Sequence, residues 1–114
     1  MADTGIFALA AVHADWLAAR QTALAGNIAN ANVPGYKATD TVSFAQYLDA
    51  ASRSASPTMT ASLAPAMDPF VDTNRNVAVE RELFRAAEVR TAHGLNTAVA
   101  SSFQSLFLAA ARSQ

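Results

Sequence analysis

Residues 26–37 read GNIANANVPGYK, and this segment carries the signals that end a helix. Asn27, Asn30 and Asn32 recur along it. Asparagine suits a helix C-terminus, because it tolerates left-handed backbone and can hydrogen-bond its own main chain. Ligand binding by the three asparagines is the alternative. A helix-terminating role is the simpler interpretation, and it is compatible with contacts to other chains.

The same segment also contains a turn signal. Val33 precedes a proline, so its helical conformation is disfavoured. Pro34 and Gly35 fit the two central positions of a type II turn, where the second position needs a positive φ angle. The segment therefore predicts that the chain changes direction here, and Tyr36 then offers an aromatic anchor.

Upstream of this turn, one helix is predicted from about residue 4 to residue 30. Leu9, Val12 and Trp16 recur at spacings of three and four, and Leu24 widens the apolar surface. A helix of about 26 residues is about 39 Å long. Such a length suits a bundle or a coiled coil better than a small globular protein.

A second long helix is predicted over about residues 77–111. Its apolar stripe contains Leu83, Leu95, Val99, Phe103 and Leu106. Glu80 and Glu82 lie near its start, where carboxylates interact favourably with the helix dipole. Asn76 is a candidate N-cap.

Between the two helices, about residues 31–76 are expected to form a connector. This region contains all four prolines, and residues 50–69 are rich in alanine, serine, threonine and proline. A short helix fits about residues 42–52. The predicted fold is all-α, with one domain over residues 1–114. In it, the two terminal helices pack as an antiparallel, coiled-coil-like hairpin.

The composition narrows the partners of this chain. It has 114 residues, a net charge of −1 and 15% charged residues, which gives no electrostatic reason to propose nucleic acid. Its residues are 52% hydrophobic but only 8% aromatic, because alanine is abundant. Alanine favours helices but buries little area, so we expect helices that gain stability in a larger assembly. No stretch approaches the roughly 20 apolar residues of a membrane span.

Groups with catalytic potential are few and scattered. His13 and His93 have no carboxylate three or four residues away as a companion ligand or base, so packing roles are expected. Helix-start and ion-pair roles account for Glu80, Glu82 and Glu88 better than acid–base chemistry. The sequence contains no phosphate loop, dinucleotide fingerprint, metal motif or nucleophile elbow. We therefore expect no enzyme activity, no cofactor, no metal and no small-molecule substrate.

Two sequence elements resemble a known family. Residues 27–36, with the pattern NIANANxPGY, are similar to the signature shared by flagellar rod, hook and related axial proteins, which usually has threonine where this chain has Val33. Residues 37–44 resemble the stretch that follows the signature in proximal rod proteins. Residues 76–82 resemble the element that opens the C-terminal helix in the same family. Hook and distal rod proteins carry large β-rich insertions between their ends, and this chain has no room for one.

The resemblance implies a structural subunit of the proximal rod in the bacterial flagellar basal body. Its partners would be copies of itself, other rod proteins, the base of the rod at the membrane ring and export gate, and the flagellar type III export apparatus. It would polymerise helically in the periplasmic space and be exported without a cleaved signal peptide. The turn residues expected to serve assembly are Asn27, Ile28, Asn30, Asn32, Pro34, Gly35 and Tyr36.

Two questions stay open at this point. The rival functions are another short rod protein and, from a different class, a cytoplasmic flagellar export adaptor. The large apolar residues Trp16, Phe103 and Phe107 could pack within one chain or between chains, because both arrangements need the same pattern.

Overall fold

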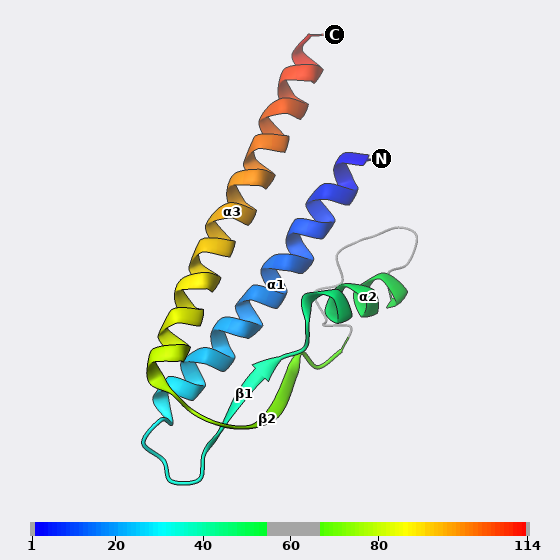
Figure 1. Ribbon diagram of the computed structural model, residues 1–114. Coiled ribbons are helices and arrows are strands. Elements are labelled where there is room, and N and C mark those ends of the chain that lie inside the picture. The colour runs from blue at the N-terminus through cyan, green and yellow to red at the C-terminus, as the bar shows by residue number, and fades with distance from the viewer. Residues whose placement is uncertain (1, 55–66, 114) are drawn as a thin grey trace.

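The computed structural model describes residues 2–54 and 67–113, and two long helices dominate it (Figure 1). Helix α1 spans Ala2–Ala29 and helix α3 spans Val79–Arg112. They lie side by side and run in opposite directions, as successive contacts show: His13 meets Asn96, whereas Asn27 meets Glu82. The two predicted terminal helices are confirmed. The molecule is elongated, measuring 63 × 28 × 17 Å.

Helix α1 ends at the predicted segment. The side-chain amide and the backbone N–H of Asn30 both donate to the carbonyl of Gly26, at 2.8 and 3.1 Å, and so close the last turn. Beyond it, the Tyr36 N–H donates to the Val33 carbonyl at 3.2 Å, and Gly35 has a φ angle of 80°. A positive φ at this position favours glycine.

The all-α prediction is wrong in one respect, because the region between the helices contains a small sheet. Strand β1 (Lys37–Thr41) pairs antiparallel with strand β2 (Phe70–Asn76). The register pairs Thr39 with Asp72 and Thr41 with Phe70, with an irregularity between Lys37 and Thr39. Neither strand shows the alternation of apolar and polar residues that identifies a strand, so sequence patterning had no signal to use.

Helix α2 (Phe44–Ser54) is the short helix that the sequence suggested, starting and ending slightly later than expected. It begins with a capping box: the Ser43 hydroxyl accepts from the Gln46 N–H at 3.2 Å, and the Gln46 side chain accepts from the Ser43 N–H at 3.3 Å. Tyr47 is buried on its inner face. Burial raises the pKa of the Tyr47 hydroxyl, and the nearby Asp15 carboxylate adds to the rise. The expected loop over residues 50–69 falls largely outside the described residues.

The start of α3 corrects a second expectation. Its N-cap residue is Ala78, which makes no capping bond through its side chain, so Asn76 is not the cap. Asn76 instead ends strand β2, and its side-chain oxygen accepts from the Lys37 ammonium at 2.7 Å. The Asn76 side chain therefore contacts the neighbouring strand and does not cap the helix.

The core is small and centres on α1. Leu17, Leu24 and Val89 form the buried cluster, and Trp16, Ala86 and Ala92 pack against it. Helix α1 lies between α3 on one side and β1 with α2 on the other (Figure 1). It is therefore covered from two sides, whereas α3 is covered mainly by α1. No helix within the described residues is both long enough and apolar enough to cross a membrane.

Truncating a buried leucine to alanine should lower the free energy of unfolding far more than truncating an exposed leucine. Leu17 is 1% exposed, so Leu17→Ala should lower the free energy of unfolding by about 2–5 kcal/mol. Leu83 is 55% exposed, and Leu83→Ala should change it by less than about 0.5 kcal/mol. Urea unfolding followed by circular dichroism measures both values. Equal losses in the two variants would show that this core does not hold the isolated chain together.

Candidate structural junction around Asn27

Asn27 is the most completely enclosed polar residue of the signature segment, with 0% of its surface exposed. Its side-chain amide donates to the Thr39 carbonyl at 2.8 Å and to Glu82 Oε2 at 3.0 Å. Its side-chain oxygen accepts from the Thr39 N–H at 2.8 Å and from the Tyr36 hydroxyl at 3.5 Å. One carboxamide therefore links α1, β1 and α3.

The bonds to Thr39 explain how a two-stranded sheet can pack against a helix. In an antiparallel pair, alternate residues direct their N–H and C=O groups away from the partner strand. Thr39 directs both groups toward Asn27, which offers one donor and one acceptor, as a neighbouring strand would. The carboxamide thus satisfies a strand edge that is turned toward α1 and would otherwise be buried without partners.

Glu82 contributes a carboxylate from the other side of the junction and is only 1% exposed. Burying a carboxylate is costly unless hydrogen bonds and an opposite charge accompany it. Asn27 supplies the hydrogen bond, and the Arg85 guanidinium lies 3.8 Å from Glu82 Oε1. The sequence predicted a helix-start role for Glu82, but not its burial.

The charges continue from Glu82 toward the sheet. Arg85 lies 3.9 Å from Asp40 of β1, and Asp40 also pairs with Arg75 of β2 at 3.3 Å. The four side chains therefore alternate in sign from α3 across both strands. Each pair is partly exposed to solvent except at Glu82, so the outer pairs contribute little stability individually. Together they balance the buried carboxylate.

The other signature residues have separate positions. Asn30 closes the end of α1, and Ile28 is half-buried. Asn32, Pro34 and Gly35 are exposed on the turn that follows. The signature therefore divides into an inner part that ties the elements together and an outer part that faces solvent.

The residues expected to pack between helices fall into two groups, which differ in how far the structure buries them. Leu24 is buried, and Val12 and Trp16 are half-buried. The remaining six are exposed in the single chain: Leu9, Leu83, Leu95, Val99, Phe103 and Leu106. The structure thus uses the first group within the chain and leaves the second group free.

His13 lies in a shallow apolar depression of about 200 Å³ formed by α1, α2 and α3. Its ring contacts Phe44 edge-on, with 4.8 Å between ring centroids, and its Nδ1 lies 3.2 Å from Asn96 Oδ1. The described residues contain no cluster of three potential metal ligands. Sequence reasoning missed Asn96, because an isolated asparagine within a helix carries no local signal of its partner.

Substituting the buried asparagine of the signature should destabilise the fold, whereas substituting an exposed one should not. Asn27→Ala leaves both backbone groups of Thr39 and the Glu82 carboxylate without their partner, so it should lower the free energy of unfolding by at least about 2 kcal/mol. Asn32→Ala, at an exposed position, should change it by less than about 0.5 kcal/mol. Hydrogen exchange of the Thr39 amide should accelerate only in the first variant. Unchanged Thr39 exchange in Asn27→Ala would contradict the junction.

Comparison with known proteins identifies relatives of this chain. The family model for the flagella basal body rod protein matches residues 16–37, which include the end of α1, Asn27 and the turn. The flagellar basal body rod protein FlgB of Agrobacterium fabrum is 27% identical over 120 aligned residues, which cover 90% of this chain and 90% of the relative. The similarity therefore extends over both long helices. This chain is therefore similar to flagellar basal-body rod proteins, both in the segment around Asn27 and along most of its length.

Proposed function

We propose that this protein is a subunit of the proximal rod, and that it polymerises helically into the axial drive shaft between the inner-membrane ring and the distal rod and hook. The observation that carries the proposal is the unpartnered apolar surface of α3. Every residue of 101–112 is exposed, although this stretch contains Phe103, Leu106, Phe107 and Leu108. A lone chain gains nothing from such a surface, whereas an assembly can bury it.

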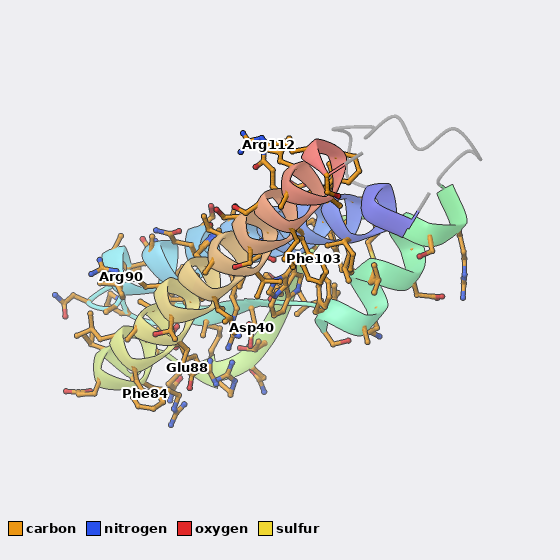
Figure 2. The ribbon with its side chains drawn as sticks, turned by 90° about the horizontal axis from the view of Figure 1, so that it is seen from above. Asp40, Phe84, Glu88, Arg90, Phe103 and Arg112 are labelled. Atoms are coloured by element: carbon orange, nitrogen blue, oxygen red, sulfur yellow. The ribbon has the colours of Figure 1, made fainter. Side chains whose placement is uncertain are left out.

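The exposed apolar residues run along most of α3. Figure 2 labels Phe84 near the beginning of the helix and Phe103 toward its end, and these residues are 68% and 45% exposed. Between them, Leu95 and Val99 are also exposed and continue the spacing of four that leads to Phe103. Residues at such spacing share one side of a helix, which is the arrangement that packs against another helix.

Helical polymerisation requires contacts that repeat without closing into a ring. Different surfaces of successive copies then meet, and the assembly grows as a helix. The elongated helix pair suits such stacking, because its exposed apolar surface extends along the long axis. Partners under this proposal are copies of the chain, other rod proteins, the membrane ring with the export gate, and the type III export apparatus. Its location is the periplasmic part of the basal body, reached without a cleaved signal peptide.

Mass spectrometry of purified hook–basal bodies tests the proposal directly. The chain should be present in wild-type basal bodies, and a strain that lacks it should assemble no rod or hook. Complete basal bodies in the deletion strain would reject the rod role. In that case a cytoplasmic export adaptor, which should be a folded protein absent from basal bodies, would become the better explanation.

A pair of neighbouring substitutions tests the α3 surface itself. Leu106 is 66% exposed, so Leu106→Asp should leave the fold intact but place a charge in the contact between chains. Ser105→Asp adds the same charge one residue away, on a different side of the helix. In complementation of the deletion strain, Leu106→Asp should reduce swarming motility at least about tenfold relative to Ser105→Asp, as expected for loss of a buried apolar contact. Equal motility of the two strains would exclude Leu106 from the contact.

A further inference from the structure

Polar side chains pair across the contact between α1 and α3 at more than one place. Asn27 donates to Glu82 near the turn, as described above. Farther along the helices, the Asn96 side-chain amide donates to the Ala10 carbonyl at 3.0 Å, and its oxygen lies 3.2 Å from His13 Nδ1, where the imidazole N–H can donate. Asn96 therefore reaches both the backbone and a side chain of the opposite helix.

The two pairs have the same spacing on both helices. Fourteen residues separate His13 from Asn27 on α1, and fourteen separate Glu82 from Asn96 on α3. Fourteen residues are two heptads, the repeat over which two α-helices return to the same contact in a coiled coil. Arg20, midway between the α1 members, lies 3.8 Å from Glu88 of α3. Polar contacts thus recur once per heptad along α1.

The apolar contacts cannot define the alignment of the helices as sharply. Among the described residues, the core offers Leu17, Leu24 and Val89 as its large buried aliphatic side chains, and its α3 side includes small alanines. Sliding α3 by one heptad would set Leu17 opposite Val99 in place of Ala92, so apolar contact would persist. The same slide would set Asn27 opposite Val89 and leave the buried Glu82 carboxylate without its amide partner.

We propose that the His13–Asn96 pair, together with Asn27–Glu82, fixes the register of α1 against α3. A polar residue within an otherwise apolar helix contact selects one alignment, because every other alignment leaves it without a partner. The register has a consequence for the end of α3. In the structure this end extends past the start of α1 (Figure 1). It includes Leu108, whereas Leu106 and Phe107 lie level with the first residues of α1 in the register that pairs His13 with Asn96. A slide of one heptad would bring the start of α1 alongside it. The register thus sets how much apolar surface α3 leaves free.

Disulfide trapping can measure the register, because the chain contains no cysteine. Ala23 and Ala86 both lie between the Arg20–Glu88 and Asn27–Glu82 contacts, so Ala23→Cys with Ala86→Cys reports the native register. Ala23→Cys with His93→Cys, seven residues farther along α3, reports the slipped register. The purified full-length chain is oxidised mildly, and intramolecular closure is timed on non-reducing gels.

The informative background is Asn96→Leu, which removes one polar pair without touching the β1 junction. It should raise the closure rate of the slipped pair roughly tenfold, as expected for losing hydrogen bonds worth about 1.4 kcal/mol. Thr91→Leu adds the same side chain at an exposed α3 position and should leave that rate unchanged. Asn96→Ala, which adds no bulk, provides a second test if Asn96→Leu loses its helical circular dichroism.

The results decide the proposal independently of the rod function. Fast closure of the native pair in the unchanged background, with faster slipping in either Asn96 variant than in Thr91→Leu, supports it. Slipped closure in both Asn96 variants at the Thr91→Leu rate overturns it, and so does failure of the native pair to close in the unchanged background. None of these outcomes depends on whether the chain enters basal bodies.

Discussion

The Asn27 carboxamide is the interaction on which the arrangement of the elements depends. It fills the unpaired edge of β1 with a donor and an acceptor, and it gives the buried Glu82 carboxylate a hydrogen bond. An amide group serves this position well, because it combines donors and an acceptor in one plane. A carboxylate could not donate to Glu82, and an apolar side chain would leave several buried groups unpaired.

The junction also explains why the molecule is covered unevenly. Since β1 and α2 pack against α1, that helix is enclosed on two sides, and α3 keeps most of its own surface free. The chain thus places its small core around Leu17 and Leu24, and leaves large apolar residues such as Phe84 and Phe103 outside it. For a lone globular protein this distribution is unfavourable. For a subunit whose neighbours cover α3, it is the expected one.

We infer that polar side chains, rather than apolar ones, determine how α1 and α3 are aligned. Alanine-rich helices can approach closely. Because the alanine side chain is a single methyl group, however, packing differs little between one alignment of the two helices and another. Asn96 and Glu82 add contacts that are satisfied only in one alignment. Such groups add less stability than a fully apolar contact would, but they exclude alternatives. Under the proposed register, these polar contacts within the chain set how much of the apolar surface of α3 is exposed.

The sequence by itself determined the two long helices, the place where the first one ends, and the resemblance to rod proteins, because these rest on helical periodicity and on the neighbouring residues Asn30 to Tyr36. Only the tertiary structure decided the rest. Strands β1 and β2 lack an alternating apolar pattern, and they are held by their pairing with each other and by the bonds between Asn27 and Thr39. Glu82 is buried because of a residue 55 positions away, and no local pattern carries that information. Whether an apolar residue of α3 is buried or exposed likewise depends on whether α1 lies beside it, and this is decided by the packing of the two helices.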